Sequence, residues 1–185
     1  MTAIDRLFEE HVLILQVAES LSVFVDRLES DEADHRSDLV RLMTFFREFA
    51  DLLHHEKEES LLLPALVLAG LRWDDGVLAD IRKDHELERQ MLQTLRHAAL
   101  QSSPWSLMDQ QRVIDVGRRF VEFTRQHIDT EDGRLHPLVP TKLDGPALSE
   151  LNKHLDRFDA RMETSGELNM LRELAAALVR EFSRV

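Results

Sequence analysis

Apolar residues recur at spacings of three and four along most of the chain, which is the period of an α-helix. The pattern is interrupted at polar or Pro/Gly-containing stretches near residues 29–37, 70–75, 101–106 and 138–146. These interruptions predict four long helices over about 3–28, 37–63, 74–100 and 105–135, and two shorter helices over about 146–163 and 167–183. No segment shows the alternation expected of a β-strand.

Residues at the predicted helix starts agree with this division. Thr2 stands three residues before Asp5, as in a capping box, and Asp74 is placed to cap the third helix. Ser103 and Pro104 suit the N-cap and first turn of the fourth helix. Short connections between long amphipathic helices favour antiparallel neighbours. We therefore expect an all-α fold, an up-down-up-down four-helix bundle over residues 1–140 with a C-terminal helical appendage over residues 141–185 packed on it.

Composition narrows the class of protein and of partner. Of the 185 residues, 43% are hydrophobic and 31% are charged, as expected for a soluble globular protein with a sizeable core. The net charge of −12 argues against nucleic acid and anionic membrane surfaces as partners, because both require basic patches. The absence of cysteine excludes disulfides, thiolate metal sites and a cysteine nucleophile. No apolar run is long enough to cross a bilayer, and a cytoplasmic location is the default expectation.

Every predicted long helix carries a histidine within its apolar stripe, and two of them add a glutamate four residues later. These residues are His11, His54 with Glu58, His85, and His127 with Glu131. A lone histidine on an apolar face is more often a hydrogen-bonded core residue than a ligand. Four histidines and two carboxylates in one core are different, because their burial is costly unless a shared cation pairs with all of them.

The six candidate ligands also form an internal repeat. The two histidines are 43 residues apart in the first half and 42 in the second, and each half ends in an HxxxE motif. A proline follows six residues after each glutamate, at positions 64 and 137, so both helices are expected to kink or end just past the site. Two halves related by a pseudo-twofold axis would bring four imidazoles and two bridging carboxylates to a two-metal centre with open positions.

The donor set indicates the metal. Imidazole and carboxylate without thiolate suit iron or manganese, and zinc is tolerated; two nearby ions sharing two carboxylates favour redox di-iron. Other helical metal sites fit poorly. Ferritin-like sites use ExxH pairs, and the only such pair here is Glu32 and His35 in a polar stretch. The His-Asp dipeptide of HD-type phosphohydrolases is absent.

These residues resemble the hemerythrin-like HHE cation-binding domain family. HHEKEESLLLP at residues 54–64 is similar to the family motif HHxKEExxLFP, and FEEH, KDHELER and HIDTEDGRLHP match around the other histidines. The resemblance covers residues 1 to about 140. It implies a di-iron centre, oxo- or hydroxo-bridged when oxidised, with ligands at His11, His54, Glu58, His85, His127 and Glu131, most like the iron-cluster repair proteins. Leu63 and His136 replace the phenylalanine that precedes each proline in the family, and the cysteine-containing segment of the repair proteins has no counterpart.

The remaining candidates receive simpler interpretations. His55 and Glu59 form a second HxxxE pair one position along, on a more polar side, and are expected to face the edge of the bundle, either touching ligands from outside or solvated. Glu88 either accepts a hydrogen bond from a ligand histidine or is solvated. The other histidines are expected at the surface or at helix caps, with one of them near enough to the Glu131 turn to face the pocket; they are His35, His97, His136 and His154.

The sequence thus predicts a non-haem di-iron protein that binds or reduces a small oxidant, namely dioxygen, peroxide or nitric oxide, in oxidative or nitrosative stress or in iron homeostasis. Three alternatives stay open. The first is an iron- or redox-sensing module recognised by a protein partner, the second is an iron donor for damaged clusters, and the third is a structural bundle with a fortuitous polar core.

Overall fold

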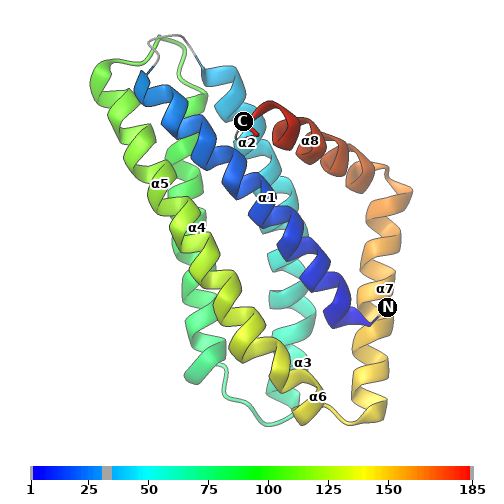
Figure 1. Ribbon diagram of the computed structural model, residues 1–185. Helices are drawn as coiled ribbons and strands as arrows, with labels where there is room; N and C mark the ends of the chain where they lie inside the picture. Colours follow the sequence, from blue (N-terminus) through cyan, green and yellow to red (C-terminus); the bar gives the residue numbers. More distant parts are fainter. Residues whose placement is uncertain (1, 31–34, 184–185) are drawn as a thin grey trace.

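The computed structural model describes residues 2–30 and 35–183, and within these ranges every regular element is a helix (Figure 1). The predicted all-α class is confirmed. Glu32, one half of the rejected ExxH pair, lies outside the described residues. Among the described residues, no helix is long and apolar enough to cross a membrane.

The helices follow the predicted order, with changes of helix type inside two of them. The first is α1 (Ala3–Ser30), and the second run comprises α2 (Arg36–Phe45), the π-helices η1 (Phe46–His55) and η2 (Glu58–Leu62), and α3 (Leu63–Leu68). The third is α4 (Gly76–Ala99). The fourth run comprises α5 (Leu107–Thr130), the π-helix η3 (Glu131–Leu135), the 3₁₀ turn η4 (His136–Leu138) and α6 (Val139–Lys142). The last two are α7 (Gly145–Thr164) and α8 (Glu167–Glu181).

The four long runs lie side by side along their lengths (Figure 1). α1 packs against α5, α5 against α4, and α4 against α2 and η1. Gly117 permits a close approach of α5 to α1, because a Cβ atom there would lie 2.7 Å from Val25 Cγ1. α8 contacts α1 and α2, and α7 contacts α1 and η2, so the C-terminal helices cover one side of the long runs.

Side-chain caps mark the starts of α1, α4 and α5. The predicted pair at the start of α1 is confirmed, since Thr2 Oγ1 accepts from the Asp5 N–H at 3.2 Å and Asp5 Oδ2 accepts from the Thr2 N–H at 2.7 Å. The cap of α4 is Asp75, one residue later than predicted. The predicted start of α5 at Ser103 and Pro104 is wrong, because Ser106 forms a full capping box with Asp109.

Both prolines follow a π-helical turn. Of the two expected outcomes, a kink or an end just past the site, the end does not occur at the prolines, since α3 continues past Pro64 to Leu68, and η4 and α6 continue past Pro137 to Lys142. A proline lacks the N–H group and crowds the carbonyl four residues earlier. At Pro64 that carbonyl belongs to Ser60 in η2, and at Pro137 it belongs to Gly133 in η3. In a π-helix each N–H group bonds to the carbonyl five residues earlier. The carbonyl four residues before each proline therefore does not depend on the N–H group that the proline lacks.

Two apolar clusters fill the interior, one toward each end of the long helices. One cluster includes Phe24, Phe46 and Phe120, and the other includes Leu7, Leu63 and Leu78. Each fully buried side chain of this kind contributes about 1.5–3 kcal/mol. Between the clusters the interior is polar, so the apolar packing on both sides stabilises a fold with buried charges at its centre.

Candidate metal centre

The six predicted ligands meet in the polar layer between the two apolar clusters. None of them is more than 2% exposed. They come from all four long runs: one from α1, one from η1, one from η2, one from α4, one from α5 and one from η3. We call His11, His54, Glu58, His85, His127 and Glu131 the central cluster.

The two glutamates of the central cluster each lie among histidines from several helices. Glu131 has Oε2 at 3.1 Å from His11 Nε2, and Oε1 at 3.2 Å from His127 Nε2 and 3.5 Å from His85 Nε2. Glu58 has Oε2 at 3.3 Å from His85 Nε2 and 3.8 Å from His54 Nε2. Both carboxylates therefore reach imidazoles from both halves of the repeat.

The electrostatics of the central cluster are those of a site built for positive charge. Burial disfavours the imidazolium of His11, but Asp132 and Glu131 outweigh it and raise its pKa to about 10. Burial likewise opposes the charge on His127, yet Glu131 and Asp84 raise its pKa to about 10. The neighbouring imidazoles lower the pKa of Glu58 to about 2 against the effect of burial and of Glu131. Without metal, protons on the imidazoles thus neutralise the glutamates, and metal binding must displace them.

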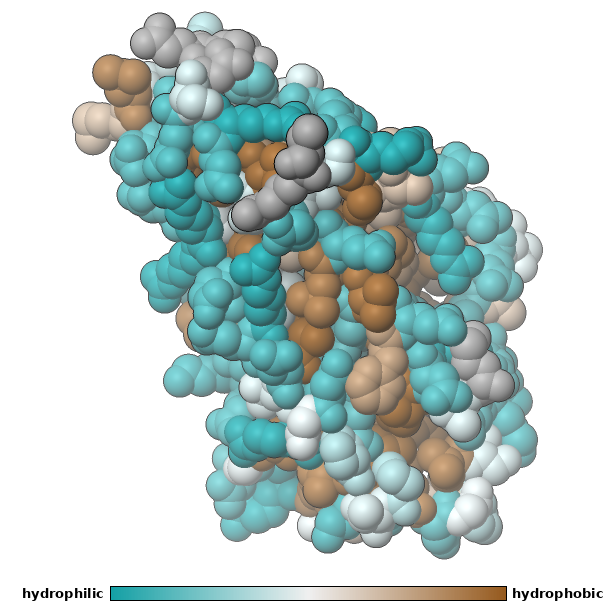
Figure 2. Space-filling model, viewed as in Figure 1, coloured by the Kyte–Doolittle hydropathy of each residue, from teal (hydrophilic) through white to brown (hydrophobic). Residues whose placement is uncertain are grey.

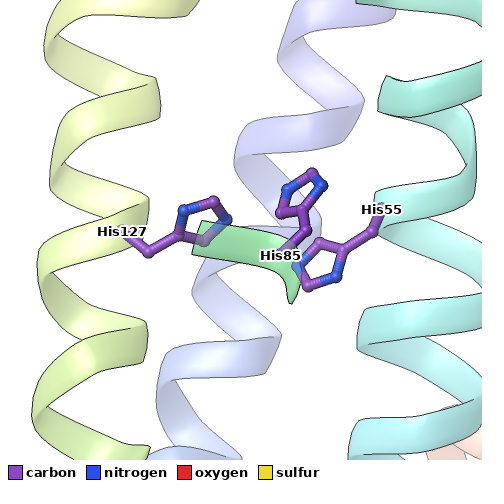
Figure 3. A group of neighbouring side chains, drawn as sticks. All are labelled: His55, His85 and His127. Carbon is purple, nitrogen blue, oxygen red and sulfur yellow. The ribbon is translucent and has the colours of Figure 1, made fainter. Parts of the chain in front are cut away.

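His55 lies inside the centre, which corrects the expectation that it faces the bundle edge. It is 4% exposed and stacks on His85 with ring centroids 3.9 Å apart. Burial and the charge on His85 lower the pKa of His55 well below its usual value, so its imidazole is neutral and able to bind a metal. Figure 3 shows His55, His85 and His127 converging from three helices.

Potential ligand atoms within 4.8 Å of one another form two principal groups. One group contains the three histidines at positions 55, 85 and 127. The other contains His11, His54, Glu58 and Glu131, with His11 Nε2 and His54 Nε2 only 2.9 Å apart. The structure therefore brings all six predicted residues together, and adds His55.

Each histidine of the central cluster has a carboxylate beside its Nδ1 atom, away from the centre. This arrangement holds the ring in place and leaves Nε2 facing inward, as is usual for metal-binding histidines. The pairs are His11 with Asp132 at 2.8 Å, His54 with Glu10 at 2.9 Å, His85 with Glu59 at 2.6 Å and His127 with Asp84 at 3.6 Å. Glu59 accordingly touches a predicted ligand from outside, one of the two roles expected for it.

Residues 2–139 match the family model of the hemerythrin HHE cation binding domain. The chain belongs to this hemerythrin family. Comparisons with curated proteins and with solved structures gave no significant match. Membership of the hemerythrin family implies that the buried histidines and glutamates bind a cation, typically iron.

The residues present fit such a cation. Both side-chain oxygens of Glu58 and of Glu131 are buried without a well-oriented hydrogen bond in the described part of the chain, as are His85 Nε2 and both ring nitrogens of His127. Buried polar atoms normally have partners, and leaving them unpaired costs about 1–3 kcal/mol each. Imidazole nitrogens and carboxylate oxygens are donors that iron and manganese accept.

His136 and Asp132 extend the hemerythrin centre toward the start of α1. His136 is 2% exposed and stacks on His11 with centroids 5.3 Å apart, so its expected place at the surface or at a cap is wrong and the expectation that it faces the pocket is confirmed. Its Nδ1 lies 3.3 Å from Asp132 Oδ1, and its Nε2 lies 3.7 Å from Glu58 Oε1. The remaining three histidines lie outside the centre; His97 and His154 are exposed, and His35 precedes α2.

Two further buried charges support the centre from outside. Lys57 is 1% exposed and pairs with Glu10, the partner of His54, and with Asp159 of α7 at 3.1 Å. Glu88 is 5% exposed, so it is not solvated; it accepts a hydrogen bond from Thr124 at 2.5 Å and lies 3.4 Å from His55 Nε2. Burial raises the pKa of Glu88.

Proposed function

We propose that this hemerythrin-family protein is a non-haem di-iron protein that binds or reduces a small oxidant such as dioxygen, peroxide or nitric oxide. The observation that carries the proposal is the position of Glu58 and Glu131. Both are fully buried, both lie near histidines of both halves of the repeat, and the oxygens of both accept no well-oriented hydrogen bond within the described residues. Such carboxylates are suited to bridging two ions. We take the long helices to form an up-down-up-down bundle around them.

The residues of the chain would have three roles: binding the ions, holding the ligand rings and excluding water. The central cluster supplies the six donors, and manganese or zinc would also be accepted by them. The carboxylates beside the Nδ1 atoms hold the rings, and the apolar clusters above and below keep water from the centre. Two iron ions bound there would exchange electrons with the oxidant.

Metal analysis and absorption spectroscopy test this proposal. Protein loaded with Fe(II) without oxygen and then desalted should retain two ions per chain, and oxidation should produce near-ultraviolet absorption. His54→Ala should abolish that absorption, whereas His154→Ala, on the surface, should not change it. Consumption of peroxide or nitric oxide beyond one equivalent per centre would indicate an enzyme. One ion per chain, or no change of absorption on oxidation, would contradict the di-iron centre.

A sensing role is the second candidate, and the contact between Lys57 and Asp159 favours it. Through Lys57 and Glu10, His54 is linked to α7, which lies after the matched hemerythrin domain. A change at His54 would therefore reach the C-terminal helices. Hydrogen exchange of α7 and α8, compared between the ferrous, ferric and metal-free protein, tests this role. Identical protection in all three states would contradict it.

A further inference from the structure

His136 occupies the same place in the second half of the repeat as Leu63 does in the first. Each follows the glutamate of its half by five positions, and its N–H group bonds to the carbonyl oxygen of that glutamate. In an α-helix, side chains five positions apart point about 140° away from each other, because each residue turns by about 100°. The bonding of a π-helix, from each N–H group to the carbonyl five residues earlier, brings them close to one face. Both side chains are buried beside the centre, and only that of His136 is polar.

The ring of His136 lies under an apolar surface at the start of α1, and both of its nitrogens are buried. Figure 2 shows apolar side chains gathered on this face, between the first turns of α1 and the α6 region. The surface is lined by Ile4, Phe8, Pro137, Val139, Pro140 and Leu148. Phe8 packs edge-on against the ring of His136, with centroids 5.0 Å apart. The nitrogens are therefore shielded from water and need partners inside the protein.

Two carboxylate oxygens lie opposite these nitrogens. His136 Nδ1 is 3.3 Å from Asp132 Oδ1, and His136 Nε2 is 3.7 Å from Glu58 Oε1. Asp132 Oδ1 already has a donor, because it lies 2.8 Å from His11 Nδ1. Glu58 Oε1 accepts no well-oriented hydrogen bond within the described residues. A proton on His136 Nε2 would therefore serve the oxygen that still lacks a donor.

The two glutamates of the central cluster differ in this respect. Glu131 has Oε2 at 3.1 Å from His11 Nε2 and Oε1 at 3.2 Å from His127 Nε2, so both of its oxygens lie beside histidines of the central cluster. Glu58 has Oε2 at 3.3 Å from His85 Nε2, but its Oε1 faces His136. The repeat thus gives Glu58 a histidine outside the central cluster, and the corresponding residue of the other half, Leu63, has no side-chain N–H group to offer.

We propose that His136 is a positioning residue of the metal centre, which donates a hydrogen bond from Nε2 to Glu58 Oε1 when metal is bound. The inference rests on the proposed function in taking Glu58 as a metal ligand. At 3.7 Å the two atoms are too far apart for a hydrogen bond, and a movement of roughly 1 Å brings them to the usual distance of about 2.8 Å. A carboxylate oxygen has two lone pairs, so Oε1 can bind an ion and accept this bond together.

The hydrogen bond would have two effects on bound metal. It fixes the direction of the Glu58 carboxylate, which raises the affinity for the ions. It also draws electron density from the carboxylate, which favours ferrous over ferric iron and raises the reduction potential.

The first experiment locates the proton on the ring of His136. Zinc is diamagnetic and is accepted by the same donors, so the full chain loaded with Zn(II) is studied by long-range ¹H–¹⁵N NMR of its histidine rings. The signals of His136 are those missing from His136→Gln. We expect a proton on Nε2 that exchanges slowly with water, because the atom is buried. A ring that carries its only proton on Nδ1 would overturn the inference.

The second experiment compares three substitutions of His136. Glutamine places an amide near the position of Nε2, asparagine places one near Nδ1, and methionine resembles glutamine in length but has no donor. His136→Met and His136→Asn should lower the affinity for Zn(II) about 10 to 100-fold in competition with a chelating dye, and His136→Gln should stay close to the wild type. Leu63→Met is the matched control in the other half; it removes no donor, roughly conserves volume and should leave the affinity unchanged.

The reduction potential of the iron-loaded protein is a readout that a purely structural role would not move. We expect it to fall in His136→Met and His136→Asn and to be restored in His136→Gln. Helicity and the melting temperature of the metal-free chain show which variants are folded. An equal loss of affinity in all three variants would mean that the packing of the ring matters rather than its donor, and would overturn the inference.

Two further outcomes separate this inference from the proposed function. Two ions per chain, with equal affinities and potentials in the wild type, His136→Met and His136→Gln, would overturn the role of His136 and leave the proposed function standing. The expected zinc results, together with a ferrous protein that does not react with dioxygen, peroxide or nitric oxide, would overturn the proposed function and support the role of His136.

Discussion

Replacing Glu131 with glutamine tests whether the charges of the metal-free centre depend on one another. The substitution keeps the shape of the side chain and removes a negative charge that lies 3.1 Å from His11 Nε2 and 3.2 Å from His127 Nε2. Both histidines have a pKa raised to about 10, so both are protonated at neutral pH when metal is absent. Glu131→Gln leaves these two buried cations facing a neutral group.

The size of the effect follows from the burial of the group. Removing one partner of a buried ion pair costs about 3–5 kcal/mol. For a chain of this length each kcal/mol lowers the melting temperature by about 2–4 °C, so Glu131→Gln should lower it by roughly 6–20 °C in the presence of a chelator. Loss of protons from His11 and His127 relieves part of the cost and favours the lower end of the range.

Glu150→Gln provides the control for this prediction. Glu150 pairs with His154, four residues away, at 3.3 Å. This is the same kind of pair as Glu131 with His127, but the side chains of Glu150 and His154 both lie at the surface. Exposed pairs contribute about 0–1 kcal/mol, so its melting temperature should change little. Equal melting temperatures for Glu131→Gln and the wild type in chelator would refute the charged cluster. Loss of one metal ion with the other tightly retained would refute bridging by Glu131.

Three further predictions concern the centre. His54→Ala should abolish metal binding, whereas His55→Ala should retain at least one ion with altered absorption, as metal analysis would show; the reverse result would contradict the ligand set. In the metal-free protein the pKa of His11 is raised from 6.5 to about 10. The stabilisation of the fold by protonated His11 is therefore complete below pH 6.5 and is lost as the pH rises through 10. Metal binding strengthens over the same range, because fewer protons compete for the imidazole. The increase in melting temperature on adding Mn(II) should therefore be larger at pH 8 than at pH 6, and an equal increase would contradict the ligand role. Glu10→Gln should weaken metal affinity about 10 to 100-fold and Asp159→Asn by less, by competition with a chelating dye; an unchanged affinity in both would show that Lys57 has no influence on His54.

The helical fold could be predicted because the apolar period is strong over long segments, and the predicted helix starts lie within a few residues of the observed ones. The second and fourth runs extend beyond their predicted ends, to Leu68 and Lys142. The errors occur at the ends, where side chains compete to cap the same turn. Ser103 followed by Pro104 is a good start signal, but Ser106 with Asp109 satisfies two backbone donors at once. The sequence also could not show the π-helical turns before the two prolines, since these depend on the backbone finding another hydrogen-bonding pattern.

The gathering of the six predicted residues could be inferred because each sits four or seven positions from a core residue on its own helix. His55 was placed wrongly for a physical reason. Adjacent side chains differ by about 100° in direction, and the prediction assumed that only one direction could be inward. A helix enclosed by neighbours on two sides has a wider buried arc, and η1 also turns more gradually than an α-helix. His54 then faces His11 while His55 faces His85.

The carboxylates beside the histidines of the central cluster account for part of the acidic composition. Glu10, Asp84 and Asp132 each stand next to a predicted ligand in the sequence, where alternation of charge looks like an ordinary solvated face. In the structure each lies beside a histidine Nδ1 atom. Part of the net charge of −12 is therefore directed at the centre rather than spread over the surface. A cation entering the centre would therefore be attracted by these outer carboxylates as well as by Glu58 and Glu131, and the Nδ1 contacts would at the same time keep the Nε2 atoms directed at it.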